Sequence, residues 1–460
     1  MRPSRAALWA VITAALLSGI TVMRADNRED EISTLRDQIR QLDQKLRVLE
    51  RKQEIKDEDS AAAAKTAPKV NVSDKGISFT SADGANTIKI RALVQFDSRL
   101  FFGDEAVSNN SFLLRRARLI SEGTFAKNYS YQLVPEFGGT SAPSILDANV
   151  TVAFSPEVQL KAGKFKVPVG LELLQSDSWT FFNERALPTN LVPNRDIGIQ
   201  LGGDVAAFDG SVNYAVGIFN GVGDGASSTN ADFDSDKDIA ARVLATPFKN
   251  SADSFVSGLS VGVAGSVGRE KTASALTGGY KTDGQQTFFK YKTTTIGDGE
   301  NWRLSPQLDY RAGPFGLISE YVLSVVNVRP SATGAKAELK NKSWQVAAGY
   351  VITGEDSSFN GVTPKTNFDL AAGTWGAFEV VARAEKLSID KAAFPVYADP
   401  TTSANDASTY GLGLNWYLSK VVRTSFDYYT TKFDNTVATS SSLLLRQDEK
   451  VFISRLQISF

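Results

Sequence analysis

The densest group of cationic side chains in this chain is the run Arg115-Arg116-Ala117-Arg118. Arginine carries a planar fork of N–H donors that matches the oxygens of phosphate and carboxylate groups. Successive side chains of a strand alternate between two faces, so we expect Arg116 and Arg118 on one face and Arg115 near the boundary of the other. Because the three arginines then do not all face one way, a nucleic-acid groove is disfavoured. Arginines on the inner face of a pore would suit anions.

A second polar group surrounds a long segment, residues 171–196, that follows a predicted strand. The segment is too long for a tight turn and too apolar for a solvated loop, which favours a loop folded into an interior as a constriction. The alternative is a flap that contacts a neighbouring subunit. Basic residues flank the segment, and its serine hydroxyls can donate hydrogen bonds to an anion. The candidate anion-binding residues from both groups and the neighbouring wall are Arg91, Arg116, Arg118, Lys164, Lys166, Ser176, Ser178 and Arg185.

The composition removes most other chemistry. The chain has 460 residues, 0 histidines, 0 cysteines and a formal net charge of -1. Without histidine there is no Ser–His–Asp catalysis and no imidazole metal ligand, and without cysteine there is no disulfide or thiolate site. Glu379 and Glu385 remain as paired carboxylates, but along a strand they would lie about 20 Å apart, too far to cooperate in hydrolysis. Carboxylate-only chemistry and a calcium site survive this filter. We nevertheless expect no enzyme, no metal site, no cofactor and no nucleic-acid partner.

The elements that must position these residues are predicted to be strands. Residues 88–96 alternate between apolar and polar side chains, and the same period of two recurs to the end of the chain, as in strands with two different faces. A further candidate, Thr287 to Thr295, would make the number of strands odd, so we assign it to a loop. The sixteen strands are expected to begin near Ile88, Phe112, Asn128, Ile145, Val158, Ile197, Ser211, Ile239, Leu259, Trp302, Phe315, Trp344, Phe378, Leu412, Val422 and Val451.

The last strand indicates what the two faces contact. Phe452, Leu456, Ile458 and Phe460 lie on one side of it, and an apolar outer face with a final aromatic residue is typical of a closed outer-membrane barrel. A soluble β-sandwich would also alternate, so periodicity alone does not separate the two. The terminal Phe, the export signal and aromatic residues near strand ends favour an all-β fold, a 16-stranded antiparallel transmembrane β-barrel. Charges on its luminal face would either attract solutes or pair with one another across the wall.

Residues 1–25 are predicted to be a signal peptide that is removed on export. Arg2 and Arg5 precede an apolar run from Ala6 to Ile20, and small residues end at Ala25, which is the pattern of an export signal. The alternative, a transmembrane anchor, needs ~20 uninterrupted apolar residues, and this run is shorter.

Residues 26–56 are predicted to form a short coiled-coil helix. Apolar residues recur there at the a and d positions of a heptad and form a narrow apolar stripe along the helix. A stripe of this width favours pairing with other copies of the helix, and the alternative is an amphipathic helix that lies on its own barrel. The charged and Ala-rich residues 57–75 are expected to be a flexible linker, and residues 76–460 to form the barrel. The residues of the seam are Ile32, Leu35, Ile39, Leu42, Leu46 and Leu49.

Several short runs, in this order and spacing, resemble the phosphate-selective porin O and P family over about Gly76 to Phe460. The resemblance, which the leading coiled coil shares, implies a trimeric channel with sixteen strands in the outer membrane of a Gram-negative bacterium. It also implies a third loop folded into the pore, placed after Lys166, and an arginine ladder that includes Arg116. The runs are Arg115 to Arg118, Gly163 to Pro168, Arg195 to Gly198, Thr353 to Glu355, Gly376 to Glu379 and Gly413 to Tyr417.

The chain departs from the phosphate-selective pattern near the expected constriction. No Lys or Arg occurs from Val167 to Glu184, and Asp177 lies between the two serines, where it would repel phosphate if it faces the lumen. We therefore expect a passive, anion-preferring porin with weak phosphate discrimination. The alternatives are a general porin for other small solutes, an outer-membrane hydrolase, and a structural tether to the cell wall. The expected partners are two further copies in a homotrimer, membrane lipid and lipopolysaccharide, and small anions such as phosphate.

Overall fold

The computed structural model describes residues 28–103, 109–139, 142–207, 209–229, 232, 235–276, 279–434 and 447–460. The predicted signal peptide, residues 1–25, lies outside these described residues. The chain divides between Ala67 and Pro68 into two compact units, which we describe separately. Within the described parts of the chain, no helix combines the length and the hydropathy that crossing a bilayer requires.

The described part of the first unit is the helix α2 (Arg28–Thr66). Its predicted a and d residues are exposed, from 47% at Ile32 to 64% at Leu42, so the apolar seam is open in a single chain and its pairing stays a prediction. The helix is longer than we expect from the sequence, because it continues through residues 57–66, which we assigned to the linker. Four consecutive alanines there, Ala61–Ala64, have the highest intrinsic helix propensity.

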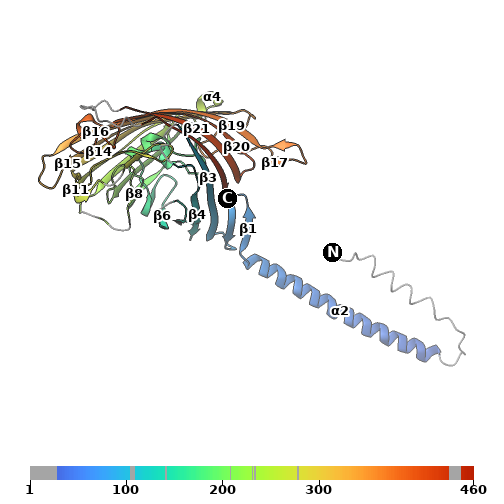
Figure 1. Cartoon of the computed structure of the whole chain (residues 1–460). Helices are drawn as coiled ribbons and strands as arrows, with labels where there is room; N and C mark the ends of the chain where they lie inside the picture. The colour runs from blue at the N-terminus through green and yellow to red at the C-terminus, as the bar shows by residue number, and fades with distance from the viewer. Residues whose placement is uncertain are drawn as a thin grey trace. The chain divides into compact units, whose positions relative to one another are not determined.

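The second unit is a closed barrel of sixteen antiparallel strands, as the sequence predicts. The last strand pairs with the first from Ser459↔Leu93 to Lys450↔Phe102, which closes the ring and leaves no open edge in the wall. The strands, visible in Figure 1, are β3 (Thr87–Phe102), β4 (Ser111–Phe125), β5 (Tyr129–Glu136), β6 (Ser144–Ala153), β7 (Gln159–Lys166), β8 (Arg195–Ala207), β9 (Gly210–Phe219), β10 (Asp238–Thr246), β11 (Leu259–Ala275), β14 (Ile296–Ala312), β15 (Phe315–Arg329), β16 (Ala337–Val351), β19 (Ala377–Ser388), β20 (Asp406–Tyr417), β21 (Val422–Asp434) and β22 (Glu449–Ser459).

A hairpin that the sequence analysis missed precedes the barrel. Strands β1 (Lys69–Ser73) and β2 (Gly76–Thr80) pair with each other, and β2 pairs with the start of β3, from Thr80↔Thr87 to Ile77↔Ile90. This edge of β3 is available there because its pairing with β22 stops at Leu93. The expected linker is therefore wrong for residues 69–75 as well, since the pairing turns a short alternating segment into a strand.

The side chains of each strand alternate between the lumen and the outer surface. In β3, Gln95 and Asp97 are fully buried, whereas Val94 and Phe96 are 41% and 45% exposed on the outside. The outer face is thus apolar and the inner face polar, the arrangement of a barrel whose outer surface meets lipid.

The two ends of the barrel differ in the length of their connections. One end has short turns, such as residues 81–86, 126–128, 313–314 and 418–421, and two longer connections, residues 247–258 and 352–376. The other end carries long loops, including residues 276–295. In this loop β13 pairs with β12 in a separate two-stranded sheet that is not part of the barrel wall. The segment Thr287 to Thr295 is therefore part of a loop, as predicted. The remaining elements are α3 (Leu171–Leu174), η1 (Leu187–Leu191), α4 (Ser254–Ser257), β12 (Gly279–Lys281), β13 (Thr287–Lys290), β17 (Phe368–Asp369), β18 (Thr374–Trp375) and η2 (Lys391–Ala393).

The main hydrophobic core lies inside the barrel rather than between two sheets. Leu173, Leu187 and Leu191 of the loop between β7 and β8 pack in one buried cluster with wall residues such as Val322 and Leu339. The loop at residues 276–295 contributes aromatic side chains to the same cluster. Burial of these apolar side chains therefore stabilises the packing of both loops, the one between β7 and β8 and the one at residues 276–295, against the inner wall.

Candidate functional site

The loop between β7 and β8, residues 167–194, folds into the lumen as the sequence predicts. We call it the inner loop. Its backbone groups are buried and need partners, because an unpaired buried N–H or C=O is costly. Carboxylates of the wall accept from its N–H groups: Glu320 Oε1 from Leu171 at 2.7 Å, and Asp427 Oδ2 from Asn183 at 2.6 Å. The polar residues of the wall thus anchor the loop.

Cationic and amide side chains of the wall bond to the carbonyl groups of the inner loop. Arg383 Nη1 donates to Glu184 O at 3.0 Å, and Arg423 Nη1 donates to Thr180 O at 3.0 Å. Several luminal charges that the sequence places on the polar face therefore hold the constriction in place rather than line an open pore.

Three arginines converge on one carboxylate of the inner loop, Asp177. Arg116 Nη2 lies 3.1 Å from Asp177 Oδ1, and Arg185 also pairs with this oxygen. Arg118 pairs with Oδ2, and its Nε lies 2.6 Å from Glu136 Oε2. Asp177 is 4% exposed, so the group that we expected to repel anions is itself the anion that these arginines bind.

A second carboxylate of the inner loop, Glu184, is also held by three arginines. Arg115 donates to it from Nε at 2.7 Å and from Nη2 at 2.9 Å. Arg99 Nη2 and Arg455 Nη2 lie 2.8 Å and 3.1 Å from Glu184 Oε1. Paired N–H···O bonds of this kind are the geometry in which arginine binds oxyanions.

A β-bulge explains why Arg115 faces the lumen, contrary to the prediction from alternation. Gln95 pairs with Arg116 and Phe96 pairs with Leu114, so Arg115 is an extra residue opposite the β3 strand. A bulge shifts the side-chain pattern by one residue and re-aims a side chain. As a result all three arginines of the run from Arg115 to Arg118 point inward, which the sequence analysis ruled out.

The charged surroundings fix the ionisation of both carboxylates. Burial would raise the pKa of Asp177, but Arg116, Arg118 and Arg185 outweigh burial and hold this pKa well below its usual value. Burial would likewise raise the pKa of Glu184, and its arginine partners hold that pKa well below the usual range. Both side chains are therefore anionic at neutral pH.

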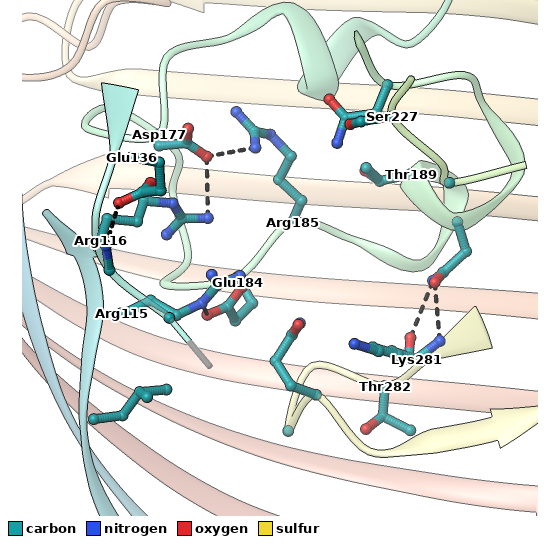
Figure 2. A pocket seen from close by; sticks show the side chains of 18 of the residues that line it. Arg115, Arg116, Glu136, Asp177, Glu184, Arg185, Thr189, Ser227, Lys281 and Thr282 are labelled. Carbon is teal, nitrogen blue, oxygen red and sulfur yellow. Dashed lines mark hydrogen bonds and ion pairs between the residues drawn. The ribbon is translucent and has the colours of Figure 1, made fainter. Parts of the chain in front are cut away.

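A cavity of about 1110 Å³ lies beside the two carboxylates. Figure 2 shows Arg115, Arg116 and Arg185 reaching toward it, with Asp177 and Glu184 between them. Its far side is polar, with hydroxyls and amides of residues 189–190, 224–227 and 281–287, and it also carries the charged side chains of Asp224 and Lys281. The cavity is thus a water-accessible part of the lumen, bordered on one side by the arginine cluster.

The predicted site residues divide into two groups. Arg116, Arg118 and Arg185 come together at Asp177 and line the cavity. The other five are not among the lining residues of that cavity in the described part of the chain. Each of these five has a partner elsewhere. Among the cations, Lys166 Nζ donates to Gln175 O at 2.9 Å, Arg91 pairs with Glu122 at 2.9 Å, and Lys164 Nζ lies 3.5 Å from Thr229 O. Of the serines, Ser178 Oγ lies 3.1 Å from Ser459 Oγ, and Ser176 Oγ accepts from Ser178 N at 3.3 Å.

Several residues of the cluster are absent from the predicted site: Arg99, Arg115, Glu136, Glu184 and Arg455. Extending the alternation of β3 past Phe96 would place Arg99 on the luminal face, in line with Gln95 and Asp97. The inward orientation of Arg115 could not be predicted in this way, because no sequence pattern indicates the position of the β-bulge.

The fold and the site define a class of protein. A sixteen-stranded barrel with an apolar exterior, a polar lumen and an inward-folded loop is an outer-membrane channel of the porin class. The family model described as phosphate-selective porin O and P matches residues 88–460, and the chain belongs to this family. Both conclusions agree with the sequence analysis.

Individual proteins are similar to this chain in sequence or in fold. Porin O of Pseudomonas aeruginosa is 24% identical over 419 residues, which cover 84% of this chain and 91% of that protein. The outer membrane channel DcaP of Acinetobacter baumannii shares the fold with a TM-score of 0.53 and 12% identity, over 83% of this chain and 99% of that one. A trimer form of OmpT from Vibrio cholerae has a TM-score of 0.52 and 12% identity, over 82% and 100%.

Family and fold together place the protein in the outer membrane of a Gram-negative bacterium, as predicted. Short turns lie on the periplasmic side of such barrels and long loops on the outside. The end that carries residues 81–86 and 352–376 is therefore the periplasmic end.

Proposed function

We propose that the protein is a passive diffusion channel that prefers anions. The observation that carries this proposal is the surplus of positive charge around the cavity, which seven cationic side chains and four carboxylates line. Rings of arginine favour anions, and a low-dielectric wall strengthens their field. The cationic residues are Arg99, Arg115, Arg116, Arg118, Arg185, Arg195 and Lys281, and the carboxylates are Glu136, Asp177, Glu184 and Asp224.

Phosphate is bound weakly in this proposal. A strong phosphate site needs several converging donors that no other group occupies. Here Asp177 and Glu184 already accept from the arginines that would form such a site. A permeating anion must compete with these tethered carboxylates, so anions are attracted to the cavity but held only briefly.

The second candidate is a general porin without anion preference. The pairing of Arg116, which is 5% exposed and bonded to Gln95 Oε1 at 2.7 Å, favours it. The surplus of arginines argues against it. The sign of the zero-current potential in a salt gradient separates the two candidates.

A chloride current titrated with phosphate tests the proposal of weak binding: we expect block only at millimolar phosphate. Half-block in the low micromolar range would show a dedicated phosphate site and overturn the proposal of weak binding.

We also propose a homotrimer in contact with membrane lipid and lipopolysaccharide. A trimer form is recorded for OmpT, and the open seam of α2 would be covered by two further copies of that helix. Cross-linking in mild detergent should give trimers. Trimers that survive deletion of residues 26–67 would show that the barrel wall alone sets the number of subunits, and monomers from the intact chain would contradict the assembly.

A further inference from the structure

A rigid hairpin lies outside the pore at the periplasmic end, in the long connection between β16 and β19. Residues 367–376 form it, with Phe368 paired to Trp375 in the two-stranded sheet of β17 and β18. Asp369 Oδ1 accepts from the N–H of Ala371 at 2.8 Å and from that of Ala372 at 3.2 Å. These bonds close the turn inside the hairpin and occupy one oxygen of the Asp369 carboxylate, which stays exposed.

Aromatic rings fix the hairpin to the lipid-facing side of the barrel. The ring of Phe368 lies 5.3 Å from that of Trp416 in an edge-on contact, and Trp416 stacks on Phe378 at 5.4 Å. Trp416 Nε1 also donates to Trp375 O at 2.7 Å. Trp416 and Phe378 point outward, because their strand neighbours Asn415 and Glu379 are buried in the lumen.

The tip of the hairpin, residues 370–373, carries no polar side chain. Leu370 is 72% exposed and Trp375 is 55% exposed, and Ala371 and Ala372 between them are exposed as well. Figure 1 shows β17 projecting from the barrel wall. The turn at residues 81–86, on the same end, has the sequence Ser-Ala-Asp-Gly-Ala-Asn and is polar at its tip. A turn at this end of the barrel can therefore form with a polar tip, so the apolar tip of the hairpin is not required for making a turn.

We propose that this hairpin is an interfacial anchor that lies in the headgroup region of the periplasmic leaflet, with phospholipid as its partner. The supporting feature is continuity: a chain of ring contacts runs from the lipid-facing wall at Phe378 through Trp416 and Phe368 to Trp375. Tryptophan concentrates at membrane interfaces, where its ring is buried and its N–H stays hydrated. Apolar side chains in such elements lie about 5–10 Å into the headgroup boundary. The inference does not depend on the ion preference of the pore.

The test uses the absence of cysteine from the natural chain. Leu370→Cys in the full-length protein is labelled with an environment-sensitive fluorophore and reconstituted into vesicles of phosphatidylethanolamine and phosphatidylglycerol. Spin-labelled lipids then quench the fluorophore from the headgroup or from deep in the acyl chain. Two labelled variants serve as references: Ala82→Cys in the polar turn, and Leu412→Cys, which is 66% exposed on the outer face of β20. Because all three positions are exposed, the substitutions leave the core intact.

We expect headgroup spin labels to quench the Leu370 label more strongly than the Ala82 label. We also expect the Leu370 label to lie at a shallower depth in the bilayer than the Leu412 label. A label with the spectrum and quenching of the Ala82 position would show that the hairpin is in water and overturn the inference. A blue-shifted label that no lipid spin label quenches would show that another copy of the chain covers the hairpin, and would also overturn it.

Discussion

Glu184 of the inner loop accepts two parallel hydrogen bonds from Arg115, from Nε at 2.7 Å and from Nη2 at 2.9 Å. A permeating oxyanion would be bound in the same geometry. With Asp177 in a second group of arginines, the channel carries two tethered anions at the place where free anions would bind. This relationship explains how a cluster of arginines can favour anions without trapping them.

Removing one tethered anion should strengthen phosphate binding. In Asp177→Asn, Arg116, Arg118 and Arg185 lose their shared carboxylate, so a phosphate ion can take its place. We expect the phosphate concentration for half-block of the chloride current to fall by roughly tenfold, which corresponds to about 1.4 kcal/mol.

Glu122→Gln is the matched control for this change. It removes the same charge from the pair with Arg91, which lies away from the cavity. We expect its half-block concentration to stay near that of the unmodified protein. Equal shifts in both variants would show that overall charge, and not the tethered anion, controls phosphate binding.

The bulge predicts which residues of β4 meet water. Arg115→Cys should react with a charged, water-soluble thiol reagent in a planar bilayer and change the channel current, because its side chain borders the cavity. Leu114→Cys, 46% exposed on the outer face, should not react, because lipid covers it. An unreactive Arg115→Cys would mean that the strand alternates without a bulge at this point.

The inner loop should loosen when a wall carboxylate is removed. Glu320→Ala leaves the N–H of Leu171 buried without its acceptor, which costs about 1–3 kcal/mol. We expect a larger and noisier single-channel conductance. Glu320→Gln keeps an acceptor oxygen and should change the conductance less. A quiet channel of unchanged conductance in the alanine variant would show that this bond does not hold the loop.

The pKa of Asp177 sets the pH range in which it acts. Its arginine partners hold the pKa well below the ordinary value, so the group stays ionised as pH falls. Stabilisation from such a group is complete above its unfolded pKa and is lost only as pH falls through the lower folded pKa. The difference in ion selectivity between the natural protein and Asp177→Asn should be constant from about pH 7 to pH 5 and shrink only below about pH 4. A midpoint between pH 5 and 6 would contradict this assignment.

The strands follow directly from the sequence because each has one apolar and one polar face. Residues 88–96 establish this pattern, and the same alternation places Arg116 and Arg118 on the luminal side, where they lie. The inner loop is also predictable, since an apolar loop of that length needs a buried surface to cover it.

The arrangement of the site is less predictable, because it depends on features that leave no local trace. The bulge at Arg115 depends on the register between β3 and β4, which a single strand does not encode. The role of Asp177 depends on three arginines brought to it from β4 and the inner loop. Read in isolation, an acidic residue predicts repulsion of anions, whereas in the folded chain Asp177 is bound by these three arginines.

The most direct test of the account is the zero-current potential of the natural channel across a potassium chloride gradient, measured between ~0.01 and 0.1 M salt, where the field of the arginines is least screened. The surplus of arginines beside the cavity predicts a potential of the sign set by chloride, which decreases in size as the salt concentration rises. A potential near zero, or one of the sign set by potassium, would contradict anion preference and favour the general porin.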